Sequence, residues 1–146
     1  MTDIRPLSQT FWVAPQITPE DVREAAAKGV RLVINNRPDG EEPGQPAGAE
    51  IEAAAKEAGL AYIAIPIRGG NIGEADLDAF DVAVANASGV TLAYCRSGMR
   101  SAALRALARA RAGGDVEAIL REAAEAGYDL AGLRPRLEAL AALNNG

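Results

Sequence analysis

Short apolar runs alternate along the chain with longer segments in which apolar residues recur at helical spacing. Four of these runs are too short for helices and carry β-branched and aromatic residues, which is typical of strands. We therefore predict strands at residues 11–13, 31–35, 61–67 and 90–94.

Capping residues mark where the predicted helices begin and end. Thr18 precedes Pro19, Asp21 follows three residues after Thr18, and Gly29 closes the segment, which together predict a capped helix. Glycines or a capping aspartate bound the other helical segments in the same way. The remaining predicted helices are residues 49–58, 74–87, 101–112, 115–126 and 133–143.

This alternation of strands and helices predicts an α/β fold. We expect a mainly parallel, four- to five-stranded sheet flanked by helices, with a helical C-terminal third. Residues 36–48 hold three prolines and three glycines and are predicted to form a loop. The length fits a single domain, residues 1–146, since no linker or internal repeat divides the chain.

Composition narrows the class of protein. The formal net charge is -5 and the sequence pI is about 4.8, which argues against a nucleic-acid partner because phosphate binding needs a basic surface. No apolar run reaches the length of a membrane span, so we expect no membrane association. A lone thiol suits a reducing compartment, and the expected location is the cytoplasm.

The chain contains no histidine and a single cysteine, Cys95. These counts exclude Ser-His and Cys-His catalysis, histidine metal sites and an intramolecular disulfide. We predict no metal and no cofactor. Any catalysis must therefore use the cysteine, arginines, carboxylates, hydroxyls or backbone amides.

One segment combines these groups, running from Tyr94 to Ser101 between a predicted strand and a predicted helix. A loop at a helix N-terminus presents free N–H groups and positive potential, and Gly98 lets the backbone curl around an anion. The same field stabilises a thiolate at Cys95, and Arg100 offers a planar fork for an oxyanion. We predict Cys95 and Arg100 as catalytic residues. The substrate-binding loop is predicted to comprise Arg96, Ser97, Gly98, Met99 and Ser101. The alternative is a cysteine that is only a small buried apolar residue.

The segment also resembles known active-site loops. Residues 95–100 match the Cys-Arg-x-Gly-x-Arg loop of rhodanese sulfurtransferases, whereas cysteine phosphatases carry Cys-x5-Arg, one residue longer. Residues 12–21, 33–41 and 62–66 resemble a bacterial family, the phosphatase-like domain of beta-lactamase hydrolase-like proteins. The resemblance spans about residues 8–112 and departs slightly at Ala14-Pro15. It implies a cysteine-phosphatase-like (dual-specificity phosphatase) architecture.

Two features favour sulfur transfer over phosphoryl transfer. Cysteine phosphatases use an aspartate general acid, and the resemblance implies that it follows the third strand, where residues 67–73 hold no carboxylate. Glu74 and Asp76 fit a helix N-terminus better than a catalytic acid. Tyr94 also stands where most cysteine phosphatases have histidine. We therefore predict a rhodanese-type sulfurtransferase, with a phosphate monoester hydrolase or a non-catalytic anion- or persulfide-binding module as alternatives.

In this interpretation Cys95 takes sulfane sulfur from thiosulfate or a persulfide and passes it to a thiol or other thiophilic acceptor. We expect Ser101 to hydrogen-bond the Cys95 sulfur. Arg37, Asp39 and Arg68 are expected at the rim of the pocket. A persulfide dioxygenase encoded elsewhere is a further expected partner, because domains of this family occur fused to such enzymes.

Overall fold

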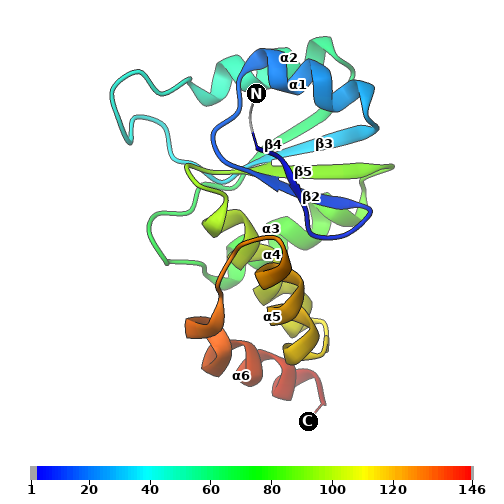
Figure 1. Cartoon of the computed structure of the whole chain (residues 1–146), viewed down its shortest axis with the longest axis vertical. Helices are drawn as coiled ribbons and strands as arrows, with labels where there is room; N and C mark the ends of the chain where they lie inside the picture. The colour runs from blue at the N-terminus through cyan, green and yellow to red at the C-terminus, as the bar shows by residue number, and fades with distance from the viewer. Residues whose placement is uncertain (1–2, 146) are drawn as a thin grey trace.

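The computed structural model describes residues 3–145 and places one five-stranded sheet between two layers of helices (Figure 1). The strand order is β1-β2-β5-β3-β4, in which β1 is antiparallel to β2 and the other neighbours are parallel. The strands are β1 (Arg5–Pro6), β2 (Phe11–Ala14), β3 (Val30–Asn35), β4 (Ala61–Ala64) and β5 (Val90–Tyr94).

Six α-helices and one short 3₁₀ helix are present among the described residues. Helices α1 and α2 cover one face of the sheet, and α3 to α6 lie on the other face (Figure 1). The helices are α1 (Pro19–Ala27), α2 (Gly48–Glu57), α3 (Glu74–Ala85), α4 (Met99–Arg111), α5 (Val116–Glu125), η1 (Ala131–Leu133) and α6 (Arg134–Asn145).

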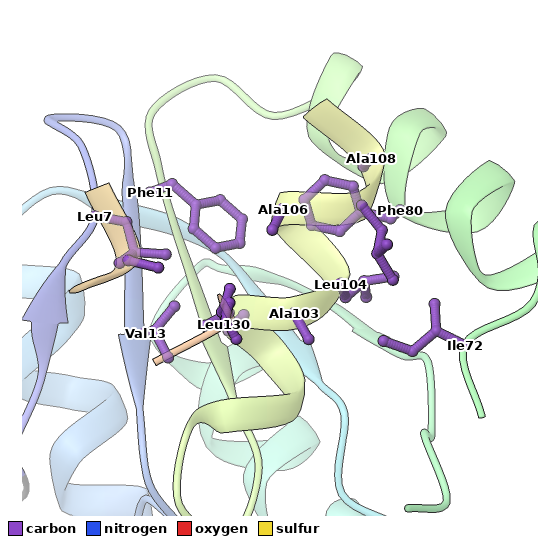
Figure 2. Packing of buried hydrophobic residues seen from close by; sticks show 14 of the residues in the cluster. Leu7, Phe11, Val13, Ile72, Phe80, Ala103, Leu104, Ala106, Ala108 and Leu130 are labelled. Carbon is purple, nitrogen blue, oxygen red and sulfur yellow. The ribbon is translucent and has the colours of Figure 1, made fainter. Parts of the chain in front are cut away.

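Side-chain alternation along the strands separates two apolar clusters. On β2, Val13 packs with the α3–α6 side and Ala14 with the α1–α2 side. On β5, Ala93 points one way while Leu92 and Tyr94 point the other. Because both faces are covered, the sheet is buried as the parallel arrangement requires. Figure 2 shows part of the larger cluster, in which Phe11 lies close to Phe80 of α3.

Helix α4 is the most enclosed helix of the fold. It contacts α3, α5 and α6 and buries residues on nearly every side, most of them alanines. Small side chains let neighbouring helices approach closely, and alanine also has the highest helix propensity. Because α4 begins at Met99, this tight packing fixes the end of the Cys95 loop.

The predicted α/β fold with a mainly parallel sheet is confirmed, with differences at element ends. Strand β1 was not predicted, since it is only two residues long and includes Pro6. Strand β4 ends at Ala64 instead of residue 67, because Pro66 cannot donate to the ladder, although Ile65 and Ile67 still donate to Asn35 and Asn36 carbonyls. Helix α4 begins two residues earlier than predicted.

None of the helices in residues 3–145 is long and apolar enough to span a bilayer.

Candidate active site

Two loops meet at the carboxyl ends of the central strands β3 and β5, the edge where open α/β sheets bind ligands. The Cys95 loop, residues 95–100, leads from β5 into α4. The second loop, residues 36–47, leads from β3 to α2 and is called the Glu41 loop below. The two are joined at their bases, because the backbone N–H of Asn36 donates to the Tyr94 carbonyl at 2.8 Å.

The Cys95 loop curls back on its own sulfur. The Cys95 side chain is fully buried, and the backbone N–H of Gly98 donates to its Sγ at 3.0 Å. An N–H at this position stabilises negative charge on the sulfur. Gly98 has φ of +97°, and a Cβ there would lie 2.2 Å from the hydroxyl of Tyr128. Only glycine fits this turn.

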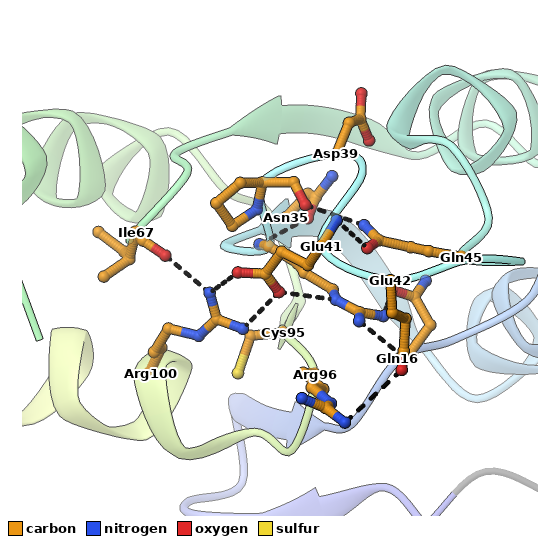
Figure 3. Close-up of polar contacts among 12 residues, drawn as sticks. Gln16, Asn35, Asp39, Glu41, Glu42, Gln45, Ile67, Cys95, Arg96 and Arg100 are labelled. Atoms are coloured by element: carbon orange, nitrogen blue, oxygen red, sulfur yellow. Dashed lines mark hydrogen bonds and ion pairs between the residues drawn. The ribbon is translucent and has the colours of Figure 1, made fainter. Parts of the chain in front are cut away.

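Arg100 lies beside the thiol and is held by a carboxylate (Figure 3). Its Nη1 donates to the Ile67 carbonyl and to Glu41 Oε2, both at 2.8 Å, and its Nη2 donates to Glu41 Oε1 at 2.8 Å. This two-pronged geometry is the strongest form of an arginine–carboxylate pair. The planar fork predicted to bind a substrate anion therefore already binds Glu41.

Arg37 holds Glu41 from the other side. Its side chain is 1% exposed, and its Nε donates to Glu41 Oε1 at 2.9 Å. The remaining nitrogens donate to Gln16 and Glu42, at 3.1 and 2.8 Å. Hydrogen bonds from Arg100 and Arg37 lower the pKa of Glu41 to about 2, so its carboxylate is ionised at neutral pH. Arg37 was expected at the pocket rim, and the structure places it under the Glu41 loop as an internal clamp.

The Glu41 loop is also tied by an amide. Gln45 accepts from the backbone N–H of Glu41 and donates to the Pro38 carbonyl, both at 2.9 Å. Arg96 reaches across from the Cys95 loop to Glu42 at 3.5 Å, with 66% of its side chain exposed. The two loops are thus connected through Arg100 and Arg96.

The expected hydrogen bond from Ser101 to the cysteine sulfur is wrong. Ser101 is buried and its hydroxyl donates to Asn36 Oδ1 at 2.7 Å. Asn36 in turn donates to the Ile65 carbonyl at 2.9 Å. These two hydrogen bonds connect the first turn of α4 to the ends of β3 and β4. Ser101 and Asn36 therefore position the loop and make no hydrogen bond to the sulfur.

The structure directs Asp39 away from this site, whereas the expectation that Arg68 lies at the pocket rim stays a prediction. Asp39 Oδ1 accepts from the backbone N–H of Gly48 at 2.8 Å, at the start of α2, and Figure 3 shows its carboxylate directed away from Cys95. It lines a separate depression beside Tyr62. Arg68 is exposed and directly follows Ile67, whose carbonyl accepts from Arg100. Asp39 is drawn away by the unpaired N–H groups of the helix N-terminus.

The carboxylates after β4 serve α3, as predicted. Asp76 Oδ2 accepts from the backbone N–H of Gly73 at 2.9 Å, and Glu74 lies in the first helical turn. Within the Cys95 loop, Ser97 Oγ accepts from the Met99 N–H at 3.2 Å. Met99 is 39% exposed.

A pocket of about 310 Å³ lies next to Arg100, between the loop after β4, the start of α4 and the C-terminal helices. Its walls are mainly apolar, and Arg100, Asp129 and Arg136 supply its charges. It provides room for the body of a substrate beside the anion fork. Across residues 3–145, no three cysteine, aspartate or glutamate side chains gather as metal ligands.

Glu41 is the site residue that sequence reasoning missed. The sequence placed it in a charged loop but could not pair it with Arg100, which is 59 residues away. The local signal was its place in the same charged loop as Arg37, with which it pairs.

Comparison with known proteins agrees with this fold. A family model described as "Beta-lactamase hydrolase-like protein, phosphatase-like domain" matches residues 3–112. Two relatives named beta-lactamase hydrolase-like protein, from Xylella fastidiosa and Agrobacterium fabrum, are 42% and 39% identical over 101 and 104 residues. The matches cover 69% and 71% of this chain but 23% and 24% of those proteins. The chain thus spans less than a quarter of their length.

Solved structures with a similar fold are also phosphatase-like. A candidate phosphatase from Neisseria meningitidis is 34% identical with a TM-score of 0.83, covering 94% of this chain and 97% of that one. A kinase associated phosphatase, solved with serine replacing its catalytic cysteine, has a TM-score of 0.72 at 13% identity, covering 100% and 96%. The second likeness concerns the fold alone.

Proposed function

This chain belongs to the family of phosphatase-like domains of beta-lactamase hydrolase-like proteins, and from that premise we propose that it is an enzyme with Cys95 as its nucleophile. The family and the phosphatase-like fold support this general statement. The finer proposal is a rhodanese-type sulfurtransferase that carries sulfane sulfur on Cys95.

The contact of the Glu41 carboxylate with Arg100 and Arg37 is the observation that carries the finer proposal. Glu41 is the carboxylate bound at Arg100, and two arginines keep it deprotonated. A phosphatase needs a protonated group to neutralise the departing alkoxide. Asp39 and Asp76 serve helix N-termini instead. Sulfur transfer releases sulfite or a thiolate, which leave without a proton.

The first half of the reaction loads the cysteine. The Cys95 thiolate attacks the outer sulfur of thiosulfate, the new S–S bond forms, and the old S–S bond breaks with its electron pair leaving on sulfite. With a persulfide R–S–SH, the outer sulfur moves with its proton and R–S⁻ leaves. Gly98 N–H and the start of α4 stabilise the charge on the sulfur during these steps.

The second half of the reaction regenerates the Cys95 thiolate. A thiophilic acceptor such as cyanide attacks the outer sulfur of the Cys95 persulfide, takes that sulfur, and leaves the bonding electrons on the cysteine. The apolar pocket beside Arg100 suits the body of a larger acceptor thiol. The partners we propose are a small anionic sulfur donor and a thiol acceptor, together with a persulfide dioxygenase that would consume persulfide products.

A phosphate monoester hydrolase remains the second candidate, favoured by the phosphatase names of the structural relatives. In that reaction the thiolate attacks phosphorus and the alkoxide leaves after taking a proton. Glu41 would have to leave Arg100 and bind a proton before it could act as the acid.

Paired assays test the two reactions. The full chain and the Cys95→Ser variant are compared with thiosulfate plus cyanide and with p-nitrophenyl phosphate. We expect thiocyanate formation that is lost in the variant, and a protein mass increased by one sulfur atom after thiosulfate alone. Cys95-dependent phosphate release without thiocyanate would overturn the proposal in favour of the hydrolase. If neither reaction depends on Cys95, the non-catalytic binding module is the interpretation that stands.

A further inference from the structure

The Glu41 carboxylate fills the guanidinium fork of Arg100, the arginine of the Cys95 loop (Figure 3). Both of its oxygens accept from the Arg100 fork at 2.8 Å, and one also accepts from Arg37 at 2.9 Å. A fork of this kind binds carboxylate, sulfonate and phosphate oxygens in the same way. Glu41 therefore acts on Arg100 as an internal substitute for a bound anion.

The neighbouring glutamate does not share this position. Glu42 pairs with Arg37 at 2.8 Å and faces Arg96 at 3.5 Å, but it makes no contact with Arg100. Its side chain is 43% exposed, against 26% for Glu41. The same loop thus carries one carboxylate in the fork and one beside it.

This arrangement affects sulfur donors unequally. The sulfane sulfur of thiosulfate is bonded to a sulfonate, so its approach brings oxyanion charge to the fork that Glu41 fills. Like charges a few ångströms apart at a partly buried site repel strongly. The outer sulfur of a persulfide R–S–SH is bonded to sulfur and hydrogen and carries no oxyanion. Its reaction requires access to the Cys95 sulfur, but it does not require Glu41 to leave Arg100.

We propose that Glu41 is a specificity-determining residue that competes with oxyanion donors for Arg100 and so directs the protein toward persulfide donors. This inference rests on the sulfur transfer proposed above. In the favoured reaction the Cys95 thiolate attacks the outer sulfur of R–S–SH, the S–S bond of the donor breaks, and R–S⁻ leaves with the electron pair. The proton stays on the transferred sulfur.

The kinetic test compares kcat/KM for thiosulfate and for 2-hydroxyethyl persulfide, an alkyl persulfide without carboxylate groups, with cyanide as acceptor. Glu41→Gln keeps the size of the side chain and removes its charge. We expect it to raise kcat/KM for thiosulfate about tenfold, and to change the persulfide value less than about threefold. Glu42→Gln removes the same charge from the same loop without emptying the fork, and should leave the donor ratio near that of the unmodified chain. An unchanged donor ratio in Glu41→Gln would overturn the inference.

A binding measurement separates this inference from the proposed function. Calorimetric titration with sulfate should show tighter binding to Glu41→Gln than to the unmodified chain, by about tenfold. Tighter sulfate binding without sulfur transfer by any form would contradict the sulfurtransferase and support competition by Glu41. Equal sulfate affinities in chains that transfer sulfur would contradict the competition alone. Glu41→Asp, whose shorter side chain withdraws from the fork, gives a second variant if Glu41→Gln does not fold.

Discussion

The Cys95 loop and the Glu41 loop lie against each other, yet different interactions hold them. The Cys95 loop is shaped by its own backbone, through the positive φ of Gly98 and the Gly98 N–H bond to sulfur. The Glu41 loop is shaped by side chains that reach other elements, above all the pairs of Glu41 with Arg100 and Arg37. One loop depends on local conformation and the other on charge.

The difference explains how each loop should respond to change. A loop built on backbone geometry tolerates salt and acid but does not tolerate a new Cβ. A loop built on ion pairs weakens when either charge is removed or screened. Variants in the two loops should therefore separate into conformational and electrostatic classes.

The largest effect is expected from Arg100, which joins the loops. Arg100→Lys keeps the positive charge but loses the planar fork. We expect kcat/KM for thiosulfate to fall about 10²- to 10³-fold, the usual cost of removing an oxyanion donor. Steady-state thiocyanate assays measure it. A fall of less than about threefold would show that charge alone suffices at this position.

Gly98→Ala tests the backbone-built loop. The alanine would adopt a left-handed conformation and place its Cβ against the Tyr128 hydroxyl. We expect the free energy of unfolding to fall by about 3 kcal/mol, combining conformational strain and overpacking. Urea denaturation measures the change. Gly40→Ala is the matched control in the other loop, since Gly40 has φ of +75° with nothing near its Cβ position. It should cost only about 1 kcal/mol, and equal costs would contradict the role of Tyr128.

Arg37→Ala tests the charge-built loop. The substitution leaves Glu41 and Glu42 without their shared buried partner. We expect a loss of about 2 kcal/mol in the free energy of unfolding, less than for a fully buried pair because both carboxylates are partly exposed. Arg37→Lys should recover less than half of the loss, since one ammonium cannot reach all three acceptors. Full recovery by lysine would show that geometry matters little there.

The smallest effect is expected from acid. Glu41 has a pKa lowered to about 2 by Arg100 and Arg37, so its contribution to stability is complete above its ordinary pKa of 4.5 and is lost as the pH falls toward 2. At pH 6 we expect the free energy of unfolding of the unmodified chain to be about 1 kcal/mol larger than that of Glu41→Gln. That difference should shrink steadily between pH 4.5 and 2.5 in urea titrations. A difference that is constant with pH would show that the Glu41 charge does not stabilise the fold.

The same contrast decides what could be predicted from the sequence. The Cys95 loop was located correctly, because a strand, a glycine and a helix follow one another within a few residues. The pairing of Glu41 with Arg100 could not be predicted, since it depends on how two distant segments meet. Asp39 was misplaced for a related reason: the start of α2 competes for its carboxylate, and sequence alone gives no measure of that competition. Ser101 was assigned to the sulfur although Asn36, buried beside it, is the partner.

The last third of the chain completes the nucleophile loop. The hydroxyl of Tyr128 donates to the Ser97 carbonyl at 3.4 Å and lies against Gly98, while the family match ends at residue 112. A ribosome makes Cys95 before it makes Tyr128, so a nascent chain carries the thiol before the residue that closes its loop. The contact between Tyr128 and the Cys95 loop can therefore form only after the segment beyond the family match has been synthesised.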